Sequence, residues 1–171
     1  MAQAVYLFFI GKRSMTNDSP APPLSVNIQV GMGAQYIKDF SFESPNVPQL
    51  LGAITAQPRM AMDVNVLSRS LGNGTFESVL KLRLETKIDD KTAFIAELAY
   101  AGLFTLPTNL PEEQTKLFLL IEAPRLLFPF ARAIIANAVR EGGFPHIIIQ
   151  PIDFLSLYGN QQNGAPMAGT A

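Results

Sequence analysis

The sequence has no cysteine and no tryptophan, only one histidine, and charged residues make up just 16% of its 171 positions. Without cysteine, a disulfide framework and any thiolate metal site are excluded, and a reducing compartment suits the chain. A histidine-based catalytic triad or metal site would depend entirely on His146, which has no partner motif, so we expect a structural or surface role for it. We therefore expect neither an enzyme nor a bound cofactor or metal ion.

Basic clusters and long apolar runs are also missing. The formal net charge is −1 and no segment gathers lysine and arginine, so nucleic-acid binding is not expected. The apolar run at residues 4–10 is far shorter than the ~20 residues that span a bilayer. Lys12 and Arg13 follow this run, whereas the positive charge of a secretory signal precedes it. Direct membrane insertion is therefore not expected.

Apolar residues, in contrast, are abundant, at 48% of the chain. A surplus of apolar side chains over what a small core can bury indicates either an oligomer or an apolar binding surface. The alternative is a well-buried domain whose loops are polar but uncharged.

The chain divides into an extension, one domain and a tail. We expect residues 1–25 to be a disordered N-terminal extension, with Met15 as a candidate start site; a terminal helix or strand that docks on the domain is the alternative. Residues 26–158 are expected to form a single domain. Residues 159–171, rich in Gln, Asn, Gly and Ala, are expected to be a flexible C-terminal tail.

Strand-like alternation dominates the first part of the domain. It covers residues 33–42, 60–70, 76–88 and 92–104, with hairpin turns at Gly72-Asn73-Gly74 and Asp89-Asp90. This predicts a four-stranded antiparallel sheet, meander-like with a long first crossover loop at residues 45–58 and with one covered face.

Helical patterns follow the strands, which is the α+β order. Pro111 and two acidic residues begin a first main helix, which Pro124 is expected to interrupt. A second main helix is expected over residues 128–140, ending at Gly142-Gly143, and Asp153 is expected to cap a short C-terminal helix. The second main helix is apolar nearly all round, so a loop, a second subunit or a bound polypeptide must cover the side away from the sheet.

The first strand and the loop after it carry the most distinctive surfaces. Alternation places Tyr36, Lys38, Phe40 and Phe42 on one face and Ile37, Asp39, Ser41 and Glu43 on the other. If the phenylalanine face is covered, Asp39, Glu43 and Glu97 point outward beside Ile95. Three such acids form either a docking patch for a basic partner or an ordinary solvated sheet face.

The crossover loop is too apolar for a solvent-exposed segment of its length. Together with the adjoining strands it offers an apolar surface that can adapt to different shapes, because methionine packs against many partners. We expect this surface to bind apolar polypeptide segments, with packing into the protein's own core as the alternative. Its residues are Phe40, Phe42, Leu50, Leu51, Ile54, Met60 and Met62.

Four ordered blocks of the sequence resemble the SecB family of bacterial protein-export chaperones. The first block, residues 38–48, has the order Lys-Asp-apolar-Ser-Phe-Glu-small-Pro-Asn-apolar-Pro. The others are residues 92–104, residues 126–132, and residues 143–154 with their Gly-Phe-Pro and Pro-Ile-Asp-Phe segments. Two departures stand out: the loop lacks the tryptophan common in the family, and Ala96 and Ala123 occupy places where members often carry cysteine.

The resemblance implies an ATP-independent cytoplasmic chaperone that holds unfolded precursor proteins and delivers them to the SecA motor of the Sec export pathway. It implies a homotetramer, a dimer of dimers with helices between two sheets. The SecA-binding residues of the family carry over onto Asp39, Glu43, Ile95 and Glu97. A general holdase of the same fold, serving for example a toxin–antitoxin pair, is the alternative.

Overall fold

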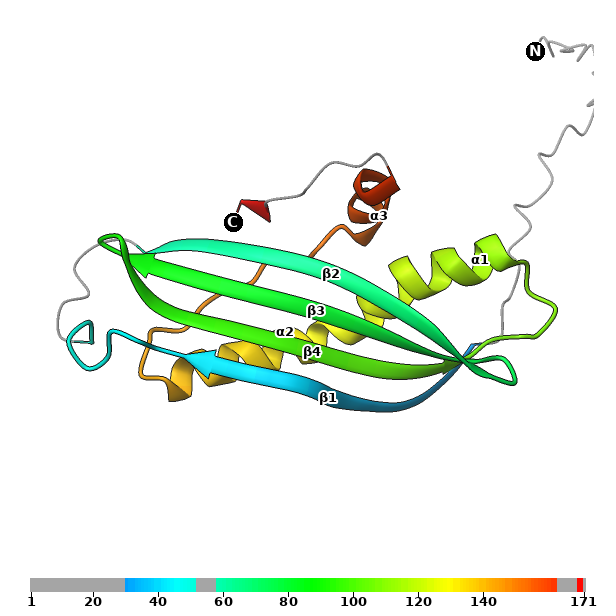
Figure 1. Cartoon of the computed structure of the whole chain (residues 1–171), viewed down its shortest axis with the longest axis horizontal. Helices are drawn as coiled ribbons and strands as arrows, with labels where there is room; N and C mark the ends of the chain where they lie inside the picture. Colours follow the sequence, from blue (N-terminus) through cyan, green and yellow to red (C-terminus); the bar gives the residue numbers. More distant parts are fainter. Residues whose placement is uncertain (1–29, 52–57, 163–168, 171) are drawn as a thin grey trace, which may run out of the picture.

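The computed structural model of the protein describes residues 30–51, 58–162 and 169–170. Four long strands form one antiparallel sheet: β1 (Gly31–Glu43), β2 (Arg59–Gly72), β3 (Thr75–Ile88) and β4 (Lys91–Thr105). A helical layer packs against one face of the sheet (Figure 1), while no described helix covers the other, which we call the outer face. This is the α+β fold that the sequence predicts.

The strand order is β1-β4-β3-β2-β5, where β5 (Gly169–Thr170) pairs with β2. Strands β2, β3 and β4 form a meander through the two predicted turns, where Asn73, Asp89 and Asp90 adopt positive φ angles. Strand β1 pairs with β4 and not with β2. The crossover loop therefore links the two sides of the four-stranded sheet.

The helical layer begins as one continuous helical stretch. Helix α1 (Glu112–Leu117) passes through a π-helical turn, η1 (Phe118–Glu122), into α2 (Ala123–Glu141), and the junction residues all keep helical backbone angles. The expected interruption at Pro124 is therefore wrong, because the second helix begins at Ala123 and contains Pro124 in its first turn.

A hydrogen bond from the sheet explains why proline is tolerated at this place. Pro124 has no N–H, so a carbonyl group in the preceding turn loses its helical partner. The buried hydroxyl group of Ser78, on β3, donates to the carbonyl oxygen of Leu119 at 3.0 Å. A buried carbonyl is satisfied in this way, and the helical layer is tied to the sheet.

The ends of the last two helices follow the predicted signals. Gly143 has a φ of +83°, and the N–H of Phe144 donates to the carbonyl of Val139 at 3.2 Å, which closes α2. The carboxylate of Asp153 accepts from the N–H groups of Leu155 and Ser156 at the start of α3 (Phe154–Gln162). Helix α3 ends at Gln162, so it continues four residues beyond 158, into the segment expected to be a flexible tail.

The core lies between the sheet and α2, but α2 has a second side that the residues described by the structure leave uncovered. Leu127 and Ile135 of α2 are buried against the sheet. On the other side Leu126 is 46% exposed and Phe130 is 50% exposed. The prediction that one sheet cannot cover this helix is consistent with both exposures.

Three expectations fall wholly or mostly outside the described residues. They are the disordered extension at 1–25, the surface role of Ile54 in the crossover loop, and the flexible tail at 159–171, of which 163–168 and 171 are not described. Among the described helices, none combines the length and the apolar character needed to cross a membrane.

Candidate functional site

The outer face of the sheet brings the predicted acidic residues together. In the pairing of β1 with β4, Asp39 lies opposite Ala99, Ser41 opposite Glu97, and Glu43 opposite Ile95. Because paired residues share a face, the carboxylates of Asp39, Glu97 and Glu43 alternate across two neighbouring strands. We call these three residues the acidic trio; all three are exposed, and Ile95 is half-buried beside them.

A β-bulge at Lys38 overturns part of the predicted alternation. Ile37 pairs with Tyr100 and Asp39 pairs with Ala99, which leaves Lys38 as one extra residue on β1. An extra residue reverses the parity of everything before it. Tyr36 and Lys38 therefore lie on the outer face and not beside Phe40 and Phe42, while Ile37 lies on the helix-facing side and is 50% exposed.

The displaced Tyr36 and Lys38 bind a buried carboxylate, that of Glu77 on β3. The Nζ atom of Lys38 lies 2.8 Å from Oε2 of Glu77, and Nε of Arg69 on β2 lies 2.6 Å from the same atom. The Tyr36 hydroxyl donates to Oε1. Only 1% of Glu77 is exposed. We call these four residues the Glu77 cluster.

The Glu77 cluster joins side chains of β1, β2 and β3 and reaches across β4, because the side chains on β4 at this place are small. Ala99 and Ala101 of β4 lie between β1 and β3 and are buried together with Val79. Burial raises the pKa of Glu77, but hydrogen bonds from Lys38, Tyr36 and Arg69 outweigh it and bring the pKa down to about 2. The carboxylate is therefore ionised at neutral pH, and it holds the edge strand β1 to β3.

A second ion-pair network lies farther along the same face, where β3 and β4 pair Arg83 with Glu97. The Nε atom of Arg83 lies 2.8 Å from Oε1 of Glu97, and its Nη1 atom lies 3.1 Å from Oε2 of Glu85. Lys87 contacts Glu85 at 3.3 Å. Hydrogen bonds to Glu85 and Glu97 raise the pKa of Arg83, and those from Arg83 and Lys87 lower the pKa of Glu85. We call these four residues the Arg83 network.

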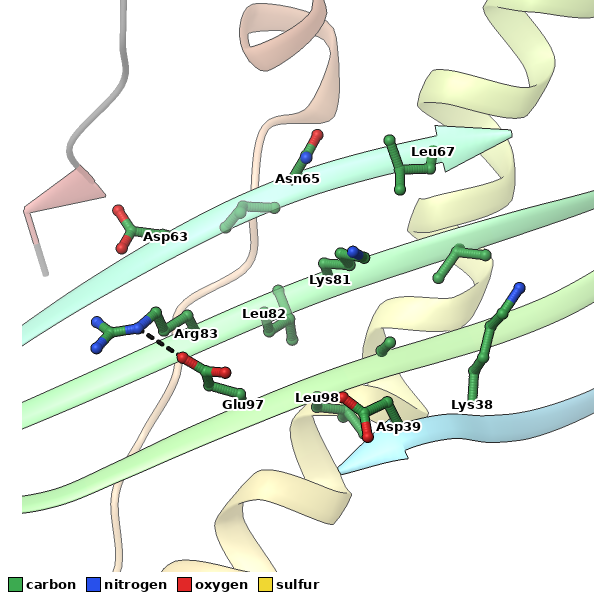
Figure 2. Close-up of a pocket in the computed structure, with 13 residues that line it drawn as sticks. Lys38, Asp39, Asp63, Asn65, Leu67, Lys81, Leu82, Arg83, Glu97 and Leu98 are labelled. Atoms are coloured by element: carbon green, nitrogen blue, oxygen red, sulfur yellow. Dashed lines mark hydrogen bonds and ion pairs between the residues drawn. The ribbon is translucent and has the colours of Figure 1, made fainter. Parts of the chain in front are cut away.

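A hollow of about 470 Å³ lies between the two networks. Figure 2 shows Arg83 and Glu97 at one side of it, Lys38 and Asp39 at another, and Asp63 on β2. Its charged side chains carry both signs, and apolar atoms of the sheet form its floor. An open hollow lined by charges of both signs suits the charged surface of another polypeptide better than a small molecule held on all sides.

Of the residues predicted to bind apolar segments, those that the structure describes lie on the helix-facing side, with one correction. Phe40 and Leu51 are exposed, and the half-buried Phe42 stacks on Phe94 with ring centroids 5.6 Å apart. Met60 and Met62 are half-buried and pack against the core. Leu50 is only 6% exposed and belongs to the core, because the start of the crossover loop packs inward.

Sequence reasoning missed the partners of the acidic residues. Alternation along β3 does not distinguish Glu77 from the exposed charges of the same strand, because its burial depends on residues of β1 and β2. The contact of Arg83 with Glu97 depends on the register of β3 against β4, which alternation along a single strand does not give. In the described part of the chain no three metal-ligating side chains gather at one place.

Comparisons with known proteins identify the family. A family-wide sequence profile, described as preprotein translocase subunit SecB, matches residues 24–165. The chain belongs to the SecB family. The protein-export protein SecB of Rhodospirillum centenum is 49% identical over 145 residues, which cover 85% of this chain and 86% of that protein. The SecB of Xanthobacter autotrophicus is 47% identical over 152 residues, 88% of this chain and 97% of that protein.

Among solved structures, a SecB-like chaperone of Mycobacterium tuberculosis, in complex with a peptide from an antitoxin, superposes with a TM-score of 0.62. The superposition covers 72% of this chain and 90% of that chain at 10% identity, so it supports the fold alone. As a member of the SecB family, this protein is a chaperone that acts in protein export.

Proposed function

We propose that this SecB-family protein holds unfolded precursor proteins in the cytoplasm without using ATP and delivers them to the SecA motor. One observation carries the SecA assignment: strand register gathers Asp39, Glu97 and Glu43 on the open face of the sheet, beside the apolar Ile95. Exposed carboxylates on a rigid sheet attract a basic partner surface without first having to be ordered.

Client polypeptides would contact the other side of β1 and its surroundings. Phe40 and Leu51 offer exposed apolar surface there, and Phe42, Met60 and Met62 lie half-buried nearby. Flexible and aromatic side chains of this kind can bury many different apolar segments without reading a particular sequence. Leu50 is not included, since a client would reach it only if the loop moved.

The proposed assembly is a homotetramer, a dimer of dimers. The uncovered side of α2, with Leu126 and Phe130, is apolar surface that a second copy would bury. In light scattering, the purified protein is expected to have the mass of four chains.

The decisive experiment changes two members of the acidic trio, Asp39→Lys and Glu97→Lys, in one variant. SecA binding, measured by calorimetry, is expected to weaken by at least about tenfold, because two attractions become repulsions. Suppression of client aggregation and the tetrameric mass should stay as in the parent, because exposed charges contribute little to stability. The matched control is Glu112→Lys with Glu113→Lys on α1, which makes the same change in net charge away from the outer face.

Unchanged SecA binding in the Asp39/Glu97 variant would show that the acidic trio is not the docking surface. A parent protein that holds clients but does not bind SecA would instead support the general holdase, serving another partner system.

A further inference from the structure

Arg83 already occupies one of the carboxylates that the proposed surface would offer to SecA. Its Nε atom lies 2.8 Å from Oε1 of Glu97, so a basic side chain of SecA must share or replace this contact. We propose that Arg83 is an intramolecular competitor for Glu97, displaced from it when a lysine or arginine side chain of SecA docks. This inference rests on the proposed SecA-binding function and assigns a regulating residue to the same surface.

The contact is suited to displacement because both partners are exposed to water. The side chain of Arg83 is 40% exposed and that of Glu97 is 51% exposed. Ion pairs in such surroundings are weak and screened by salt. An incoming cation therefore replaces the Arg83 contact at little cost.

Arg83 also has a second carboxylate to retain. Its Nη1 atom lies 3.1 Å from Glu85, which is only 25% exposed at its side chain and also contacts Lys87. When Glu97 turns to a partner, Arg83 keeps the Glu85 contact, and no cation is left without a counter-charge. The protein loses the Arg83–Glu97 pair, but each of its charged groups in the network keeps a partner, Glu97 by pairing with the incoming cation.

There is room beside Glu97 for the incoming group. The hollow of about 470 Å³ is bordered by both Glu97 and Asp39, so a cation entering it approaches two carboxylates of the acidic trio. Arg83 borders the same hollow from β3. A partner that places a basic group in the hollow contacts the carboxylates of both Asp39 and Glu97. A basic chain that cannot reach the hollow contacts a Glu97 carboxylate whose charge Arg83 already compensates. Arg83 therefore favours a specific partner over other basic chains.

The test is Arg83→Gln, with SecA affinity measured by calorimetry at low salt. We expect binding to tighten by about fivefold, the size of an exposed ion pair that no longer has to be replaced. Arg83→Lys, which keeps the charge but loses the forked guanidinium, is expected to fall between the parent and Arg83→Gln.

Lys81→Gln is the matched control. It removes one positive charge from the same strand and the same hollow, but Lys81 forms no ion pair with any described residue. Its effect should be less than about twofold, from the change in overall field alone. In a Glu97→Gln background, Arg83→Gln should no longer tighten binding.

Three results would overturn the inference while the proposed function stands: weaker or unchanged binding of Arg83→Gln, an equal gain from Lys81→Gln, or a gain that persists in the Glu97→Gln background. SecA binding by neither the parent nor any Arg83 variant would overturn the proposed function and the inference with it. Binding by Arg83→Gln but not by the parent would support the inference.

Discussion

Glu77 and Glu97 lie on the same face of the sheet, on the neighbouring strands β3 and β4, and each accepts hydrogen bonds from basic side chains. Their surroundings differ. Glu77 is 1% exposed and has three donors from two other strands, while the side chain of Glu97 is 51% exposed and is paired with Arg83. The comparison teaches that burial, not the presence of an ion pair, separates a structural carboxylate from one that is free to serve a partner.

The physical reason is the cost of an unpaired charge. A buried carboxylate that loses its cations cannot turn to water, so the donors around Glu77 contribute strongly to the stability of the fold. Glu97 is solvated with or without Arg83, so its pairing is exchangeable. One sheet face thus combines a fixed anchor for β1 with an adjustable docking surface.

The strongest test of this difference removes both cations of the Glu77 cluster, with Lys38→Met and Arg69→Met in one variant. The free energy of unfolding should fall by about 3 kcal/mol at neutral pH, because Glu77 would stay buried with only Tyr36 as donor. Urea unfolding at one fixed protein concentration measures it.

The control for that variant is Lys81→Met with Lys87→Met, which removes two cations from the same face. It should lose no more than about 1 kcal/mol, as expected for two exposed sites. If the two variants lose equal free energy of unfolding, the burial of Glu77 does not make its ion pairs more stabilising than exposed charges on the same face.

Acid should act on the buried carboxylate in a defined direction. The pKa of Glu77 is about 2 in the folded protein against an ordinary 4.5, so between these values the unfolded chain binds a proton that the folded protein does not. The stabilisation is therefore complete above about pH 5 and is lost as the pH falls toward 2, by about 3 kcal/mol in total.

Glu77→Gln lacks this titration. The difference in unfolding free energy between the parent and Glu77→Gln should therefore shrink as the pH falls from about 5 to about 2. A constant difference for Glu77→Gln would contradict the assigned role of its carboxylate.

How much of this could be predicted from the sequence depends on how local each signal is. The hairpin at Asn73, the helix end at Gly143 and the cap at Asp153 each follow from the conformational preference of one or two residues. The outward position of the acidic trio follows from alternation along two strands. These features need no knowledge of distant contacts.

The features that sequence reasoning missed depend on residues far apart in the chain. The bulge at Lys38 appears only when β1 is aligned with β4, and one extra residue then reverses the faces of Tyr36 and Ile37. The continuous helix through Pro124 depends on Ser78, which satisfies the carbonyl of Leu119 from 41 residues away. The burial of Leu50 likewise depends on how the crossover loop packs against the core.

The smallest expected effect is the contribution of the Arg83–Glu97 pair to folding, and it gives the comparison its sharpest form. A double-mutant cycle with Arg83→Gln and Glu97→Gln should give a coupling free energy of about 1 kcal/mol or less, because both side chains remain hydrated when unpaired. The coupling should decrease further as salt is added. The corresponding cycle with Arg69→Gln and Glu77→Gln should give a clearly larger coupling with less dependence on salt, since Glu77 is shielded from water.

If the Arg83–Glu97 coupling equals or exceeds the Arg69–Glu77 coupling, Glu97 is held by the fold as firmly as Glu77. In that case the exposed carboxylate would not be exchangeable, and Arg83 could not give way to a partner without destabilising the sheet.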